Sequence, residues 1–161
     1  MRLAGIVRES IVDGPGVRYV VFVQGCPHRC PGCHNPQTHD PSGGYEISSG
    51  ELEADFLLEA SQNPLLDGLT ISGGEPLVQA ADLLPLAASA KRLGLGVWLY
   101  TGYTIEEIGA LGEASQKDLL KVTDVLVDGR FDESLRTLDA GFAGSSNQKI
   151  LGREELCKYT I

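Results

Sequence analysis

Residues 18–24, Arg-Tyr-Val-Val-Phe-Val-Gln, are the stretch from which the fold of this chain can be worked out. The stretch is rich in β-branched and aromatic residues and is too short for a helix, so it predicts a buried strand. A loop over residues 25–44 follows, with four prolines and three of the four cysteines of the chain. Structured loops of this length usually carry function.

Helices and strands are expected to alternate along the rest of the chain. Ser48 with Glu51, and Thr104 with Glu107, match capping boxes that predict helix starts, and a further helix is predicted over residues 80–93. The predicted strands are residues 68–71, 97–100 and 122–127, with residues 149–151 as a candidate for one more.

This alternation predicts an α/β fold with a mainly parallel sheet. The chain of 161 residues is too short for an eight-unit barrel. We therefore expect one domain over residues 1–161, a compact partial (βα) barrel of about four to five units that is open on one side. Ligands bind at the carboxyl ends of the strands in such sheets, so four segments should meet at one rim. They are residues 25–44, 72–76, 101–102 and 128–130.

The composition limits the partners and the location. The formal net charge is −9, from 13 basic and 22 acidic residues, which makes nucleic acid a poor candidate partner. No apolar run approaches the roughly 20 residues of a membrane span, and no apolar export signal follows Met1. We expect a cytoplasmic protein without a nucleic-acid or membrane partner.

Three cysteines, Cys26, Cys30 and Cys33, have the spacing C-x3-C-x2-C. Thiolates this close on one loop can hold an iron–sulfur cluster. A four-iron cluster normally takes four cysteines, and the remaining one, Cys157, lies far along the chain. If Cys157 stays away, one iron keeps an open position, as in catalytic metal sites.

Other readings of the cysteines compete with this one. Cys30 and Cys33 followed by His34 match the rule for covalent haem attachment, and the same pair resembles a redox dithiol. Structural zinc, held by the three cysteines with His28 or His34, is the strongest rival. From the spacing alone, zinc is nearly as well supported as iron.

The segment Ser72-Gly-Gly-Glu-Pro76 favours the iron–sulfur reading. It directly follows a predicted strand, and glycines there let the backbone come close to a ligand. The carbonyls of Gly73 and Gly74, with the charge of Glu75 nearby, suit the ammonium group of an amino acid. Zinc and haem leave this feature without a use.

The cysteine spacing together with Gly-Gly-Glu-Pro is similar to the radical S-adenosylmethionine superfamily. Within it, the chain most resembles the activases of anaerobic ribonucleoside-triphosphate reductase. The segments that carry this resemblance span nearly the whole chain, and they are residues 13–16, 25–35, 70–76, 124–131 and 144–148.

The resemblance implies one [4Fe-4S] cluster per chain, held by Cys26, Cys30 and Cys33, with S-adenosyl-L-methionine as the second cofactor. It implies cleavage to a 5′-deoxyadenosyl radical that takes hydrogen from a glycine of the reductase, with a flavodoxin-type electron donor. The cofactors supply the chemistry, so no further catalytic residue is expected. An activase of another glycyl-radical enzyme, or a non-catalytic zinc-stapled binding module, is the alternative.

The resemblance also implies the cofactor-binding residues. Gly73, Gly74 and Glu75 are expected at the amino group of the methionine part. Gly32, Cys33 and His34 are expected beside the adenine, with a packing ring as the other role of His34. Arg130 is expected either at the methionine carboxylate or as a solvated arginine.

Overall fold

A computed structural model describes residues 1–160 of the chain, with seven strands in one sheet. The strands are β1 (Arg2–Ser10), β2 (Val17–Val23), β3 (Tyr45–Glu46), β4 (Leu66–Gly73), β5 (Gly96–Tyr100), β6 (Val125–Asp128) and β7 (Lys149–Leu151). The α-helices are α1 (Ser49–Gln62), α2 (Ala80–Arg92), α3 (Ile105–Leu111), α4 (Ala114–Lys121) and α5 (Arg153–Cys157). Short 3-10 turns are η1 (Pro36–Thr38), η2 (Pro76–Gln79) and η3 (Glu133–Leu135).

The sheet has the strand order β3-β1-β2-β4-β5-β6-β7 and is open. Its four central strands, β2, β4, β5 and β6, are parallel, whereas β1, β3 and β7 pair antiparallel at the two sides. The α/β class with an open, mainly parallel sheet is therefore confirmed. The candidate strand at residues 149–151 exists, but it runs antiparallel to β6 and adds no further parallel unit.

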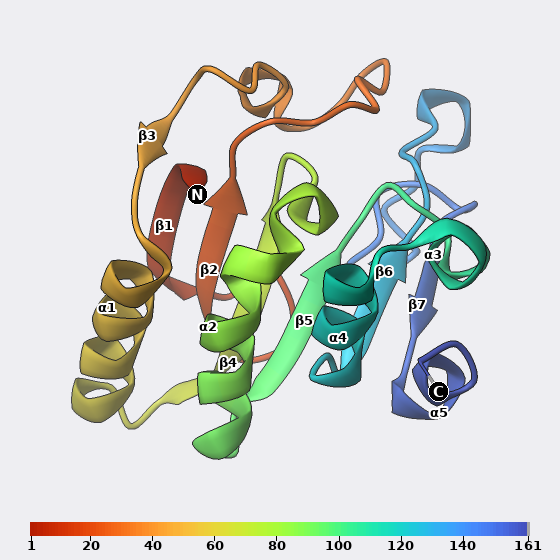
Figure 1. Cartoon of the computed structure of the whole chain (residues 1–161). Coiled ribbons are helices and arrows are strands. Elements are labelled where there is room, and N and C mark those ends of the chain that lie inside the picture. Colours follow the sequence, from red (N-terminus) through yellow and green to blue (C-terminus); the bar gives the residue numbers. More distant parts are fainter. Residues whose placement is uncertain (161) are drawn as a thin grey trace.

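Helices α1, α2 and α4 lie side by side over one face of the sheet (Figure 1). Both predicted capping boxes are present, at Ser48 of α1 and Thr104 of α3. In strand β2, Tyr19, Val21 and Val23 are fully buried in the core that the sheet shares with this helical layer, and Val20 is buried as well. The buried residues that α2 adds to the same core are Leu83, Leu86, Ala87 and Ala90.

Two predicted boundaries were wrong. The strand predicted over residues 122–127 begins at Val125, because Val122 still caps α4. The region after Thr104 forms two helices, α3 and α4, because Gly112 ends the first of them. Strand β1 was not predicted at all.

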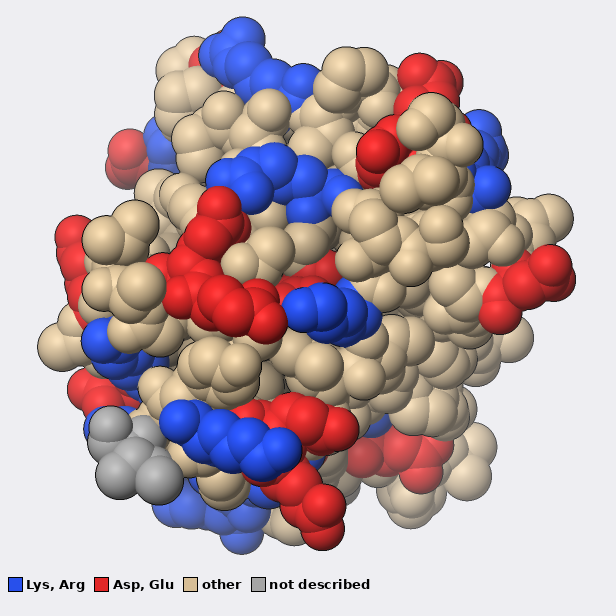
Figure 2. All heavy atoms as spheres, turned by 90° about the vertical axis from the view of Figure 1, so that its right-hand side faces the viewer, with Lys and Arg blue, Asp and Glu red and all other residues tan. Residues whose placement is uncertain are grey.

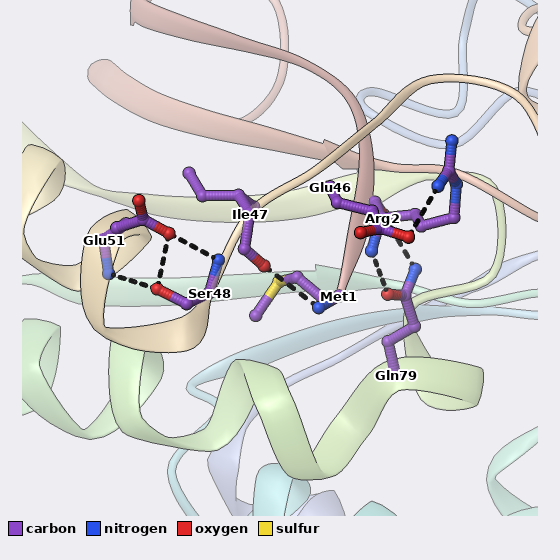
Figure 3. A pocket seen from close by; sticks show the side chains of 7 residues that line it. All are labelled: Met1, Arg2, Glu46, Ile47, Ser48, Glu51 and Gln79. Atoms are coloured by element: carbon purple, nitrogen blue, oxygen red, sulfur yellow. Dashed lines mark hydrogen bonds and ion pairs between the residues drawn. The ribbon is translucent and has the colours of Figure 1, made fainter.

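The amino-terminal end of β1 is fastened by a set of polar contacts around a cavity of about 440 Å³ (Figure 3). The Met1 ammonium donates to the carbonyl of Ile47 (3.0 Å). The Gln79 side chain accepts from the amide of Arg2 (2.7 Å) and donates to the carbonyls of Arg2 (2.9 Å) and Gln24 (3.0 Å). These contacts join β1, η2 and the end of β2. The polar residues around this cavity therefore have a structural role.

Acidic and basic side chains are interspersed on the face that carries β7 and α5 (Figure 2). Lys149 of β7 pairs with Glu106 of α3 at 3.1 Å. No patch of a single sign is visible in this view. Among residues 1–160, no helix is both long and apolar enough to cross a membrane.

Candidate functional site

The four segments predicted to meet at one rim do meet there, and the strand register explains why. Val23 at the end of β2 pairs with Gly73 at the end of β4, so the cysteine loop and the Gly-Gly-Glu-Pro segment leave the sheet side by side. In Figure 1 the loop over residues 24–44 arches above the carboxyl ends of β2 and β4.

A cavity of about 120 Å³ lies at this rim. All three cysteines of the loop line it, together with residues from every one of the other three segments. The lining residues are Cys26, His28, Cys30, Cys33, Thr38, His39, Gly73, Gly74, Tyr100, Thr101, Gly102, Gly129, Phe131 and Gln148.

The cysteine loop is braced at its base by hydrogen bonds from the main chain and from Gln24. The amides of Gly25 and Cys26 donate to the carbonyls of Thr38 (2.7 Å) and His39 (3.2 Å). The Gln24 side chain donates to the carbonyls of Gln37 (3.0 Å) and Asp40 (2.7 Å). These bonds join residues 24–26, at the start of the loop, to residues 37–40. The segment that carries Cys30 and Cys33 lies between these two ends.

The thiols are free and suited to an iron–sulfur group. Burial raises the pKa of Cys26, although main-chain N–H groups of His28 and Arg29 bond to its sulfur and oppose that shift. The amide of Asn35 donates to Cys33 Sγ at 3.4 Å. Such N–H bonds to sulfur help to set the potential of a cluster.

The three thiols of the loop line one cavity. Three thiolates around one space are a donor set that suits an iron–sulfur cluster. Within residues 1–160, no group of three His, Cys, Asp or Glu side chains is arranged to hold a single metal ion.

Cys157 lies away from this cavity. It is exposed at the end of α5, which follows β7. Because β7 runs antiparallel to β6, α5 begins at the opposite edge of the sheet from the cysteine loop (Figure 1). The chain thus presents three cysteines, and not four, to the cavity.

Gly73 and Gly74 are required by close main-chain packing. Gly73 has a φ of 101°, and a Cβ there would lie 2.4 Å from the amide nitrogen of Val23. A Cβ on Gly74 would lie 2.3 Å from the carbonyl oxygen of Gly25. Both glycines line the cavity, so their main chain is open to a ligand; that they bind one stays a prediction.

Glu75 has a different environment from the one expected. Its carboxylate is fully buried, is absent from the cavity wall, and accepts four hydrogen bonds. The donors are Leu77 N (2.9 Å), Thr101 Oγ1 (2.8 Å), Gly102 N (2.8 Å) and His28 Nε2 (2.8 Å). Glu75 therefore joins the cysteine loop to the segments after β4 and β5 by hydrogen bonds. The groups that donate to its carboxylate lie between that charge and the cavity.

We expect Glu75→Gln to lower the free energy of unfolding by about 2–4 kcal/mol. An amide would place one NH₂ group against donors that now face a carboxylate oxygen, leaving buried groups unpaired. Denaturant titration of the apoprotein measures the change. Glu46→Gln, at an exposed carboxylate, is the matched control, and equal stability of the two variants would contradict the structural role.

The residues expected beside an adenine divide between two neighbouring cavities. Cys33 lines both the 120 Å³ cavity and a second one of about 300 Å³, whereas His34 lines only the second. The His34 ring packs against Phe131, with centroids 5.0 Å apart. Gly32 lines neither cavity, but its φ of 72° favours glycine at this position.

Arg130 does not line the cavity, and its side chain is engaged by Glu107 and Tyr103. Its guanidinium donates to both carboxylate oxygens of Glu107 on α3 (3.1 and 3.2 Å) and lies 5.8 Å from the Tyr103 ring centre. The neighbouring Gly129 and Phe131 line the cavity. That Arg130 binds the methionine carboxylate stays a prediction.

Three residues of the cavity wall, Tyr100, Phe131 and Gln148, lie outside the four segments predicted to form the rim. Gln148 holds the segment after β6 in place, because its side chain accepts from the amides of Gly144 (2.9 Å) and Ser145 (3.1 Å) and donates to the carbonyl of Gly129 (2.9 Å). His39, within the predicted segment 25–44, also lines the cavity. Gln148 lies in the segment 144–148 that carries the resemblance, and this was a sequence signal for it. No sequence signal singled out His39 within the loop over residues 25–44.

Comparison with known proteins identifies relatives of the chain. Residues 12–151 match the model of a family described as "4Fe-4S single cluster domain". Proteins named anaerobic ribonucleoside-triphosphate reductase-activating protein are similar over 88% of the chain. The Escherichia coli K12 protein is 35% identical over 92% of its length, that of Salmonella typhi 34% over 92%, and that of Enterobacteria phage T4 33% over 87%.

One solved structure that resembles the chain is that of QueE from Escherichia coli. The TM-score is 0.47 and the sequence identity 21%, over 64% of this chain and 53% of that one.

Proposed function

Because this chain belongs to the family of anaerobic ribonucleoside-triphosphate reductase-activating proteins and carries a 4Fe-4S single-cluster domain, we propose that it is an activase that installs a glycyl radical on that reductase. The resemblance found in the sequence is thus confirmed at the level of the family. The proposed cofactors are one [4Fe-4S] cluster and S-adenosyl-L-methionine.

The observation that carries the proposal is the grouping of three free thiols around one cavity, with the fourth cysteine at the opposite edge of the sheet. Three thiolates can hold a cluster and leave one iron without a cysteine from this chain. An open metal position is what a site needs in order to bind a ligand directly.

A cluster held by Cys26, Cys30 and Cys33 would, when reduced, supply the electron for cleavage of S-adenosyl-L-methionine. The protein holds and orients the reactants. Gly73 and Gly74 allow the main chain to approach the amino group of the methionine part. The second cavity, with His34 and Phe131, is continuous in its lining residues with the first and offers room for the adenosyl part.

The test is to purify the protein without oxygen and measure iron, sulfide and turnover. We expect about four irons per chain and, with reductant, formation of 5′-deoxyadenosine from S-adenosyl-L-methionine. With the reductase added, electron paramagnetic resonance should show a glycine-centred doublet. Stoichiometric zinc without cleavage would contradict the proposal and favour the zinc-stapled module.

The partner and the electron donor are tested separately. Cleavage with no doublet on the reductase, but with one on another glycyl-radical protein, would assign the chain to that protein instead. A flavodoxin-type donor is proposed, and reduction of the cluster by purified flavodoxin checks it. We also propose that the protein is cytoplasmic. Residues 1–161 are proposed to form one functional domain.

A further inference from the structure

His39 carries a polar atom with no partner. Its Nε2 is buried and makes no hydrogen bond, the single side-chain nitrogen or oxygen of this kind in residues 1–160. Leaving a buried donor or acceptor unpaired is costly, and native proteins rarely do so. A partner for this nitrogen is therefore expected from outside the described protein atoms.

The position of His39 limits what that partner can be. Its carbonyl oxygen accepts from the amide of Cys26 (3.2 Å), and both residues line the 120 Å³ cavity. The same two residues also line an outer cavity of about 380 Å³ on the other side of the loop. His39 therefore lies beside Cys26, and both residues line the two cavities.

Neighbouring polar side chains are already engaged. The Gln24 amide is bonded to the carbonyls of Gln37 and Asp40, Thr38 Oγ1 donates to the carbonyl of Asn35 (2.7 Å), and His28 is bonded to Glu75. The partners that remain are water, in either cavity, and a group bound in the 120 Å³ cavity. The atoms that three cysteines bring to such a group are sulfurs and metals.

We propose that His39, in the tautomer with its proton on Nε2, donates a hydrogen bond to a sulfur of the cluster at the Cys26 corner. The inference rests on the proposed function, because it requires the cluster. Hydrogen bonds to sulfur stabilise the more negative, reduced state and raise the reduction potential. The hydrogen bond from His39 would thus make the cluster easier to reduce.

The experiment compares reduction potentials of the resting cluster, without S-adenosyl-L-methionine. His39→Leu removes the donor, His39→Gln keeps an N–H near the same place, and Val78→Ala changes the outer cavity without touching a polar group. Each anaerobically reconstituted protein is titrated with mediators while the signal of the reduced cluster is followed by electron paramagnetic resonance.

We expect His39→Leu to keep its iron but to lower the ratio of reduced to oxidised cluster about fivefold at a fixed potential, the effect of losing one hydrogen bond. His39→Gln should recover most of the ratio, and Val78→Ala should match the unmodified protein. An unchanged potential in His39→Leu would overturn the inference. Loss of iron from folded His39→Leu and His39→Gln would also overturn it, because that result marks an iron ligand.

A second measurement does not depend on the folding of His39→Leu. In protein labelled with ¹⁵N-histidine, pulsed resonance of the reduced cluster should show a weak ¹⁵N coupling that His39→Gln removes. A strong coupling, typical of direct ligation, or no coupling assignable to His39 would refute the hydrogen bond. If the unmodified protein binds no cluster at all, the proposed function is contradicted. That result differs from the two outcomes that refute only the hydrogen bond of His39.

Discussion

Cys30→Ala is expected to abolish cluster assembly and, with it, cleavage of S-adenosyl-L-methionine. Cys30 is one of three thiols that surround the cavity, and two remaining thiolates would leave two irons of a four-iron cluster without a protein ligand. Iron and sulfide content after anaerobic reconstitution, with 5′-deoxyadenosine measured by chromatography, gives the result. Iron should fall to background, with no detectable 5′-deoxyadenosine.

Cys157→Ala is the matched control for this change. It removes a thiol from the same chain at an exposed position on α5, away from the cavity. Cluster content and cleavage should both equal those of the unmodified protein. Loss of the cluster in Cys157→Ala would mean that a fourth cysteine binds iron, and the open position on which the proposed chemistry depends would not exist.

Gly74→Ala is expected to lower the free energy of unfolding by about 3 kcal/mol and to reduce cluster loading. The added Cβ would lie 2.3 Å from the carbonyl oxygen of Gly25 and 3.1 Å from that of Thr38, both of which are main-chain atoms at the base of the cysteine loop. The loop must therefore move away from β4. Urea denaturation of the apoprotein and iron content of the reconstituted protein measure the two effects.

Gly50→Ala controls for the general effect of replacing glycine. Gly50 lies in the first turn of α1, and a Cβ there meets nothing within 4 Å. Its unfolding free energy should change by no more than about 1 kcal/mol, with normal iron content. If Gly74→Ala proved as stable and as fully loaded as Gly50→Ala, the close approach of the two loops would not matter for the site.

The sequence predicted the elements whose signals are local. The capping boxes at Ser48 and Thr104 mark α1 and α3, and the apolar run of β2 marks a buried strand. Strand β1 was missed because Arg2–Ser10 contains two arginines, a glutamate and a glycine. Its strand conformation comes from antiparallel pairing with β2, a contact that no local pattern records.

The same distinction applies to the site. The spacing of the cysteines and the Gly-Gly-Glu-Pro segment are local patterns, and both were placed at the correct rim. The sequence does not reveal that His28, Thr101 and Gly102 all donate to the Glu75 carboxylate. The expected place of Glu75 near the amino group of the methionine part stays a prediction. His39 gave no signal, because an unpaired buried nitrogen is visible only in three dimensions.

The bracing of the cysteine loop bears on what happens when air destroys the metal group. The bonds of Gln24, Gly25 and Cys26 to the carbonyls of residues 37–40 involve no thiol, and the sheet core packs without the site. A finger-like domain unfolds once it is stripped of its metal. This chain should instead stay folded as the apoprotein after the cluster is lost. A new cluster can then be assembled on the same chain, without synthesis of new protein.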